Sequence, residues 1–255
     1  MKILICNDDG VHAPGIKILA QYLSEVAEVI VVAPLEERST TGHTLTLDHP
    51  LRVVEISPKV WGCSGYPADC ALMGLAEIMK DDRPDLIVSG INRGANLGQD
   101  VYYSGTVAAA REAIFHGIPG ISVSSVLDFL PAPTVKHHYE TAAQFIQKIV
   151  KNGAHELIAP MHLLNVNVPN VEIEKIEGME LTHLGFRHYS EEIQRRHDFR
   201  ERPYYWIGGV YKGSSRQIGT DCWAVEQNKI SLSVLNLLGQ SSEKIDEWKS
   251  FLNQL

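Results

Sequence analysis

The stretch Lys2-Ile-Leu-Ile-Cys6-Asn7-Asp8-Asp9-Gly10 decides the fold, because an apolar run ends abruptly in two adjacent aspartates and a glycine. A run that is hydrophobic on both faces is typical of a central strand in a parallel sheet that helices cover on both sides. Open α/β sheets bind their ligands outside the carboxyl ends of such strands. We therefore expect Asp8 and Asp9 to lie where the chemistry takes place.

Asp8 and Asp9 form a pair of like charges, and such a pair favours a bound cation. Two carboxylates about 4 Å apart repel each other by roughly 1 kcal/mol in water and by about 4 kcal/mol at an intermediate dielectric constant. A divalent ion is the simplest way to relieve this repulsion. The alternative is structural, with one aspartate capping a helix and the other facing the solvent.

Short apolar runs alternate with helical patterns through the first two thirds of the chain. The expected strands are Ile3–Cys6, Glu28–Ala33, Asp85–Ser89, Ile118–Val123 and Leu163–Val168, and the expected helices are Gly15–Val26, Ala68–Met79, Val107–His116 and Val135–Val150. This alternation predicts an α/β fold with a Rossmann-like, doubly wound, mostly parallel sheet. The segment Thr44 to Trp61 has a period of two and predicts additional β structure. We expect residues 1–170 to form a Rossmann-like catalytic core.

The composition changes after Pro169. Four arginines and four acidic residues are interspersed between His188 and Tyr205, and Pro203-Tyr-Tyr-Trp206 follows at the end of this stretch. A charged ribbon with aromatic residues cannot bury itself alone, so we expect a protruding hairpin arm over about 185–210 that packs on another subunit. A solvated hairpin is the alternative. A final strand over Ile230–Leu238 and a terminal helix over 242–255 are expected to complete the same compact unit, which makes 171–255 a β-rich C-terminal extension.

The charge and cysteine content exclude several classes of protein. The 255 residues include 23 basic and 31 acidic ones, and the net charge of −8 argues against a nucleic-acid polymer as partner. The four cysteines form no Cys-x-x-Cys pair and several lie in apolar segments, which indicates reduced, buried thiols of a cytoplasmic protein. The apolar stretches are shorter than the ~20 residues that span a bilayer, and the chain opens directly on a core strand, so we expect no membrane partner, export signal or anchor.

A glycine-rich stretch follows the expected strand at 85–89. It reads Ser89-Gly-Ile-Asn92-Arg-Gly-Ala-Asn96-Leu-Gly98, and its glycines permit tight turns of the backbone. Asn92 and Asn96 add neutral oxygen and amide groups. We therefore expect this stretch to fold closely around a ligand.

A helix start comes a few residues later. Ser104 is a good N-cap, so the free N–H groups of Gly105 and Thr106 are expected to point to the same edge of the sheet as Asp8. A helix end orients an anion with only ~0.3 to 2 kcal/mol. A metal ion must therefore supply most of the electrostatic catalysis.

The loop Ala33–Gly42 carries Ser39, which on its own is more often a turn residue. Together with the carboxylates and amides, its hydroxyl would complete an all-oxygen set of ligands. Such a set selects a hard ion, Mg²⁺ or Mn²⁺, rather than zinc.

Taken together, these motifs resemble the SurE (survival protein E) family of metal-dependent 5′/3′-nucleotidases over nearly the whole chain. The resemblance rests on Asn7–Gly10, Ala33–Ser39, Ser89–Gly98, Tyr103–Glu112, Gly117–Ser124, Leu164–Pro169 and Thr220–Val225. It implies one divalent metal ion per subunit, Mg²⁺ or Mn²⁺, held by Asp8, Asp9, Ser39 and Asn92. It also implies phosphate contacts from Asn96, Ser104, Gly105 and Thr106.

The same resemblance implies an activity and an assembly. Family members hydrolyse nucleoside 5′- and 3′-monophosphates to nucleoside and phosphate, and some also cleave short polyphosphate. The expected assembly is a homodimer or homotetramer with an exchanged C-terminal arm. The resemblance thus implies a small nucleotide as substrate rather than a polymer.

The expected mechanism is in-line attack of water on a phosphoryl group held between the ion and the turn at 104–106. Asp8 and Asp9 are the catalytic residues, because either one can orient or deprotonate the water; a covalent phosphoenzyme stays open. We interpret His12, His43 and the pair His137-His138 as surface or packing residues.

Two other functions compete with hydrolysis. A non-catalytic nucleotide sensor would use the same cradle without turnover. A receiver-like signalling module fits poorly, because the strand at 85–88 ends in Ser89-Gly90 rather than in a phosphoacceptor aspartate.

Overall fold

The structure is a computed structural model and describes residues 1–127, 136–239 and 245–252. Within these residues, nine strands form one sheet in the order β3-β4-β2-β1-β5-β6-β7-β13-β8. The strands are β1 (Lys2–Cys6), β2 (Glu28–Pro34), β3 (Val53–Ser57), β4 (Val60–Cys63), β5 (Leu86–Arg93), β6 (Gly120–Val126), β7 (His162–Pro169), β8 (Met179–Thr182) and β13 (Ile230–Asn236). The run from β4 to β7 is parallel, β3 and β13 are antiparallel to their inner neighbours, and β8 is parallel to β13.

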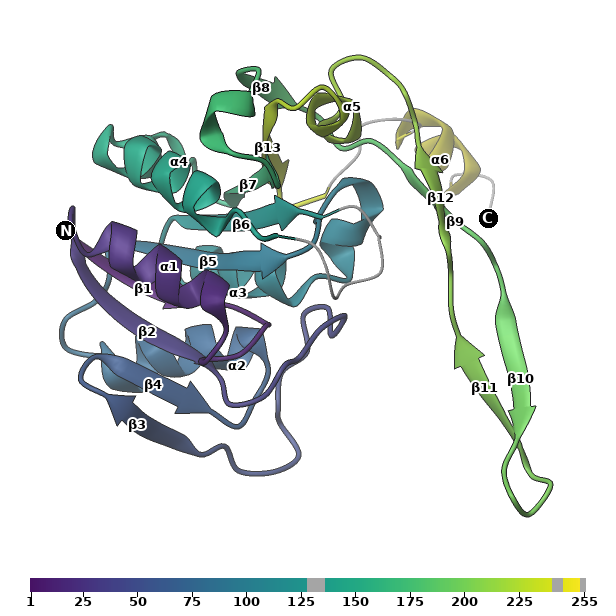
Figure 1. The fold of residues 1–255 in the computed structure, drawn as a ribbon, viewed down its shortest axis with the longest axis horizontal. Coiled ribbons are helices and arrows are strands. Elements are labelled where there is room, and N and C mark those ends of the chain that lie inside the picture. The colour runs from purple at the N-terminus through teal and green to yellow at the C-terminus, as the bar shows by residue number, and fades with distance from the viewer. Residues whose placement is uncertain (128–135, 240–244, 253–255) are drawn as a thin grey trace.

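Helices cover both faces of this sheet (Figure 1). On one face α1 (Pro14–Leu23) packs on α4 (Tyr139–Lys151), and on the other α2 (Pro67–Met73) packs on α3 (Gly105–Phe115). The α/β, Rossmann-like fold class is therefore confirmed. A β-rich C-terminal part follows the Rossmann-like part of the chain.

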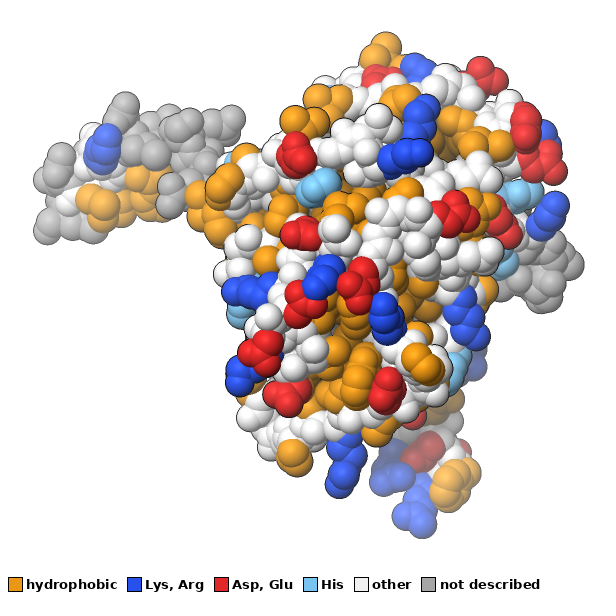
Figure 2. Space-filling view, turned by 90° about the vertical axis from the view of Figure 1, so that its left-hand side faces the viewer, with side chains coloured by type: hydrophobic (Ala, Val, Ile, Leu, Met, Phe, Trp, Pro, Cys, Tyr) orange, Lys and Arg blue, Asp and Glu red, His pale blue; other side chains and the backbone are white. Residues whose placement is uncertain are grey.

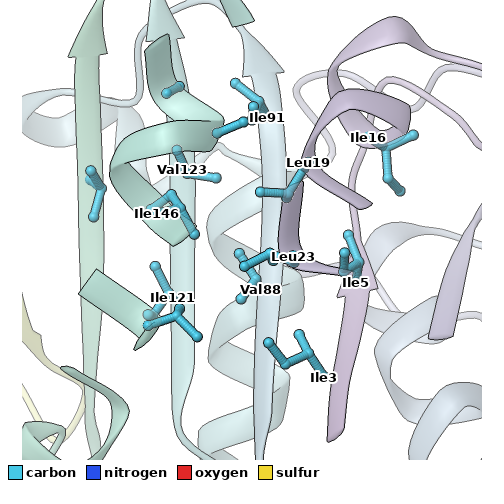
Figure 3. Close-up of a cluster of buried hydrophobic side chains, with 14 of the residues drawn as sticks. Ile3, Ile5, Ile16, Leu19, Leu23, Val88, Ile91, Ile121, Val123 and Ile146 are labelled. Atoms are coloured by element: carbon cyan, nitrogen blue, oxygen red, sulfur yellow. The ribbon is translucent and has the colours of Figure 1, made fainter. Parts of the chain in front are cut away.

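The central strand β1 shows why the sequence folds this way. Ile3 and Ile5 point into the core between the sheet and α1, where Figure 3 shows them beside Leu19 and Leu23. Leu4 and Cys6 point to the opposite face and join the core beneath α2 and α3. All four side chains are fully buried, as a strand with helices on both sides requires.

The C-terminal part contributes α5 (Asp221–Glu226), strand β13 and a long protrusion (Figure 1). At the base of the protrusion β9 (Arg187–Tyr189) pairs with β12 (Tyr211–Ser214), and further out β10 (Ile193–His197) pairs with β11 (Pro203–Ile207). Every residue of β10 and β11 is exposed. The helix α6 (Ile245–Leu252) lies in the expected terminal helix, whose remaining residues fall outside the described ones.

Several elements differ in extent from the sequence expectation. The strand expected at 85–89 continues to Arg93 as β5, and the helix expected at 68–79 changes from α2 into a π-helical turn, Gly74–Ile78. The helix expected from Val135 begins at Tyr139, while residues 128–135 lie outside the described part of the chain. Short 3-10 turns occupy Gly98–Tyr102, Ala154–Leu157 and Ile173–Lys175, the first of which is labelled η2 below.

Three expectations from composition, on the cysteines, on membrane spans and on charge, can be compared with the structure. The four cysteines are buried and carry free thiols. None of the described helices is long and apolar enough to cross a bilayer. Basic and acidic side chains are interspersed over the face seen in Figure 2, without a patch of one sign.

Candidate active site

Asp8 lies directly beyond β1, where it meets the first turn of α3. The Thr106 hydroxyl donates a hydrogen bond to Asp8 Oδ1 at 2.5 Å. A Cβ on Gly105 would lie 2.9 Å from Asp8 Cβ, so only glycine permits this approach. The N-terminus of α3 and the carboxylate are therefore in direct contact.

The two aspartates lie in surroundings that disfavour their charged forms. Burial raises the pKa of Asp8 to about 7, the hydrogen bond from Thr106 opposes that rise, and the neighbouring Asp9 adds to it. Burial also raises the pKa of Asp9, which the Arg93 backbone N–H, 3.0 Å from Asp9 Oδ2, partly offsets. A cation between the two carboxylates would favour the charged form of both.

The shape of the turn after β1 follows from Asn7 and Gly10. The Asn7 side chain donates to Gly10 O at 2.9 Å and accepts from Gly10 N–H at 3.2 Å. Gly10 has φ +100°, a conformation that glycine adopts without strain. The Asp8 carbonyl accepts the N–H of Arg38 at 2.8 Å, which ties the loop after β2 to this turn.

The other two predicted metal ligands lie on segments that reach the same turn. Asn92, next to Arg93, is half-buried, and its Nδ2 donates to Gly94 O at 3.0 Å. Its Oδ1 makes no hydrogen bond within the described residues. Ser39 is exposed and donates to Glu37 at 2.7 Å rather than to either aspartate. The hydrogen bond between the Arg93 N–H and Asp9 thus places the neighbouring residue Asn92 close to Asp9. The Ser39 hydroxyl, in contrast, faces Glu37.

The donor set fits a hard divalent cation. Asp8, Asp9 and Asn92 offer carboxylate and amide oxygens, and rotation of the Ser39 hydroxyl from Glu37 would add another. No group of three or more His, Cys, Asp and Glu side chains arranged to hold a metal ion occurs among the described residues.

The predicted phosphate-contacting residues of α3 are buried at its N-terminus. Ser104 is the N-cap, and its Oγ accepts the N–H of Val107 at 3.1 Å, as expected from the sequence. Gly105 packs against both Asp8 and Pro67. The Thr106 hydroxyl is already hydrogen-bonded to Asp8. The groups that this turn can still offer to an anion are therefore its backbone N–H groups.

Asn96 is held by a buried polar network that the sequence reasoning did not find. Its backbone N–H donates to Asn167 Oδ1 at 2.9 Å, and its carbonyl accepts from Asn165 at 2.9 Å and Asn167 at 3.0 Å. Asn96 Nδ2 donates to Ser124 Oγ at 2.8 Å, which uses one of its two hydrogens. The signal in the sequence was the alternation Asn165-Val-Asn167, which puts two amides on one face of β7.

Two of the histidines that lie near the motifs in sequence, His43 and His137, make contacts in the structure. His43 Nε2 lies 2.8 Å from Glu112 Oε2, and the His43 ring stacks on Phe115 with ring centroids 5.7 Å apart. His137, which we interpreted as a surface or packing residue, stacks on Tyr139 and is near enough to Asp9 to oppose, as a minor cause, the rise in the pKa of that carboxyl. Two cavities, of about 550 and 510 Å³, lie away from Asp8, one beside α4 and the other beside α3 and β13.

Known proteins resemble this chain over nearly its whole length. Residues 3–191 match the family model described as Survival protein SurE. Proteins named 5′-nucleotidase SurE are 44% identical over 251 residues in Vibrio campbellii, covering 97% of this chain and 94% of that protein, and 42% identical over 255 residues in Legionella pneumophila, covering 100% and 98%. The crystal structure of the SurE protein from Aquifex aeolicus superposes with a TM-score of 0.85 at 35% identity and covers 99% of this chain and 100% of that one. The chain therefore belongs to the SurE family.

Proposed function

We propose that this protein is a metal-dependent phosphomonoesterase that hydrolyses nucleoside 5′- and 3′-monophosphates to nucleoside and phosphate, with short-chain polyphosphate as a further substrate. The observation that carries the proposal is the adjacent pair Asp8 and Asp9, of which Asp8 is buried against the N-terminus of α3 and Asp9 is half-buried beside it. A hydrolase of phosphate esters needs positive charge on both sides of the phosphoryl group. At this edge of the sheet, a cation bound by the aspartates would supply it on one side and the N-terminus of α3 on the other. The names of the relatives from Vibrio and Legionella support the nucleotide as substrate.

In this proposal Asp8, Asp9, Ser39 and Asn92 hold one Mg²⁺ or Mn²⁺. When bound, the ion supplies positive charge that stabilises the transferring phosphoryl group. The N–H groups at the start of α3 and the second amide hydrogen of Asn96 orient the phosphate oxygens. An aspartate oxygen that accepts a hydrogen bond from water orients that water for in-line attack and takes up its proton as the new P–O bond forms; the P–O bond to the ester oxygen breaks, and that oxygen leaves with the nucleoside and gains a proton from solvent.

The proposal extends to assembly and location. The exposed hairpin of β10 and β11 contacts a second copy of the chain, and the molecule works as a homodimer or homotetramer through this C-terminal arm. In this proposal residues 171–255 and the catalytic core of residues 1–170 form one compact unit. The four free, buried thiols support a cytoplasmic place of action.

The test is phosphate release by the purified protein. With Mn²⁺ or Mg²⁺ we expect release from AMP, GMP and an aryl phosphate, and complete loss on addition of a chelator. Asp9→Asn is expected to remove activity, whereas Asp81→Asn, an exposed carboxylate before β5, is expected to leave it unchanged. Full activity of Asp9→Asn, or release without any metal, contradicts the mechanism. Nucleotide binding without turnover identifies the sensor instead.

A further inference from the structure

Arg38 and Tyr66 form a pair beside the turn that carries Asp8. Arg38 lies in the loop after β2, and Tyr66 is the residue before α2. The guanidinium carbon of Arg38 is 5.5 Å from the centroid of the Tyr66 ring, a cation–π contact between two segments of the chain. Both side chains are partly exposed, so a ligand can reach them.

The segments that carry this pair lie against Asp8 and against Gly105, the glycine that packs on Asp8. The Arg38 N–H donates to the Asp8 carbonyl at 2.8 Å. Pro67, which follows Tyr66, lies against Gly105 together with Asp8: a Cβ on Gly105 would be 2.9 Å from Pro67 Cγ and 2.9 Å from Asp8 Cβ. A substrate whose phosphate lies at Asp8 is therefore close to the two segments from which the Arg38 and Tyr66 side chains extend.

Arg38 has hydrogen-bonding capacity that the fold does not use. Its Nε is buried and has no hydrogen-bond partner within the described residues. Its Nη2 lies 3.7 Å from Glu36 Oε2, which is longer than a hydrogen bond, and the Glu36 side chain is 78% exposed. Buried donors without a partner are rare in folded proteins. An acceptor that a ligand brings would remove this deficiency.

The chemistry of the pair specifies the kind of group that it binds. A phenol ring and a planar guanidinium present flat π and cationic surfaces, and such surfaces stack on aromatic heterocycles. The N–H groups of the guanidinium lie in its plane and match ring nitrogen and carbonyl acceptors. Among the parts of a nucleotide, only the base has a flat aromatic face with such acceptors at its edge.

We propose that Tyr66 and Arg38 are specificity-determining residues that contact the nucleobase, so that the enzyme favours nucleotides over phosphate esters that lack a base. This proposal rests on the proposed function and deepens it. Tyr66 provides the stacking surface, and Arg38 holds the ring in place and donates to the base.

The experiment compares AMP with ribose 5-phosphate, which has the same sugar phosphate but no base. Tyr66→Ala is expected to raise the KM for AMP about 10-fold, to leave the kcat for AMP unchanged and to leave the KM for ribose 5-phosphate within about twofold. Tyr66→Phe keeps the ring and is expected to retain the AMP preference. Arg38→Lys keeps the charge without the planar fork and is expected to raise the KM for AMP about 3- to 10-fold.

The matched control is Phe199→Ala. Arg200 lies over the Phe199 ring at the same distance of 5.5 Å, but this pair is in the hairpin arm and Phe199 is 89% exposed. This substitution is expected to change neither KM. An equal rise in KM for both substrates in Tyr66→Ala, or no rise for AMP, overturns the proposal.

Failure of the proposed function is distinguishable from failure of this inference. If the unmodified protein hydrolyses neither substrate, saturation-transfer NMR of AMP with the full chain decides. Transfer to the adenine protons that is lost in Tyr66→Ala supports the base contact, and transfer that is unchanged in Tyr66→Ala, or absent in the unmodified protein, overturns it.

Discussion

At Gly105 the missing side chain determines how closely Asp8 approaches α3. A Cβ at this position would lie 2.9 Å from both Asp8 Cβ and Pro67 Cγ, closer than carbon atoms pack. Gly105→Ala is therefore expected to push Asp8 from the helix end, to reduce phosphate release at least 10-fold and to destabilise the fold by about 1–3 kcal/mol. Steady-state kinetics and thermal unfolding measure the two effects.

The control is Gly208→Ala, since a Cβ there meets no atom within 4 Å and the backbone φ is not positive. That variant is expected to match the unmodified protein in both measurements. Unchanged activity in Gly105→Ala would show that the contact between Asp8 and α3 is irrelevant to the reaction.

The sequence predicted part of this local arrangement. A strand that ends in Asp8 and a helix that starts after Ser104 belong at one sheet edge, and the structure places them in contact. The bond from Thr106 to Asp8 and the Arg38–Tyr66 pair could not be predicted, because each joins residues that only the tertiary fold brings together. The metal-binding, phosphate-binding and catalytic roles of all the predicted site residues stay predictions.

Among the elements, the loop after β2 is fastened to α3 through Glu112. Its carboxylate accepts from His43 at 2.8 Å and lies 3.0 Å from His116 Nε2. The hydrogen bond from His43 lowers the pKa of Glu112 most, burial opposes this, and the bond from His116 lowers it further. Because the folded state holds the proton less tightly than the unfolded chain, this stabilisation is complete above the ordinary pKa of 4.5 and is lost as the pH falls through the lowered pKa.

Glu112→Gln is therefore expected to lower stability at pH 7 by about 1–3 kcal/mol. The difference from the unmodified protein should shrink as the pH falls below about 4.5. Thermal unfolding between pH 3 and pH 8 measures this, with Glu140→Gln, an exposed glutamate in the first turn of α4, as the control. A difference that stays constant across this range would contradict the assignment.

Hydrogen bonds to a second buried carboxylate join η2 to the base of the arm. The fully buried Asp221 accepts backbone N–H groups from Gly98 at 2.7 Å, Gly185 at 2.7 Å and Cys222 at 2.8 Å. Asp221→Asn replaces one of the two carboxylate oxygens by an NH₂ group, which then faces a backbone N–H donor. We expect this change to lower the free energy of unfolding by about 1–3 kcal/mol. Hydrogen exchange should show faster exchange at Gly98, two residues after Asn96.

The arm offers a matched control in Asp198, whose carboxylate also accepts two backbone N–H groups, from Arg200 and Arg202, but in an exposed turn. Asp198→Asn is expected to leave the exchange at Gly98 unchanged. Equal exchange rates at Gly98 in the two variants would contradict the conclusion that Asp221 holds η2 to the base of the arm.

Element boundaries were less predictable than element types. The sequence predicted β5 only to Ser89, since Gly90 and Gly94 indicate a loop, yet the strand continues to Arg93 with a register shift before Asn92. A Cβ on Gly90 would lie 2.3 Å from Val123 O, so this glycine allows close packing of β5 on β6 instead of ending the strand. Composition alone does not separate these two uses of glycine.

For the whole molecule, the arm is the feature that calls for a partner. An isolated two-stranded hairpin is marginal in water, and this one leaves Trp206 61% and Ile207 91% exposed. Light scattering of the purified protein is expected to show a dimer or tetramer. The double variant Trp206→Glu and Ile207→Lys is expected to shift it toward smaller species, and a monomeric unmodified protein would contradict the proposal.

The alternation of strands and helices predicted the doubly wound sheet, because each βα step buries a strand on both faces. The sequence also indicated the aromatic hairpin. It did not indicate that β13 enters the sheet between β7 and β8, since pairing between distant strands leaves no local pattern.

This placement of β13 bears on the order in which a nascent chain can fold. The strands β1, β2, β5 and β6 and the helix α3 all lie before residue 127, so the edge that carries Asp8 can assemble while the rest is still being translated. In contrast β8 is made before the arm, whereas β13, its one sheet neighbour among the described residues, is made after the arm. A ribosome that pauses within the arm therefore holds a chain whose β8 has bare strand edges, open to another nascent chain or to a chaperone.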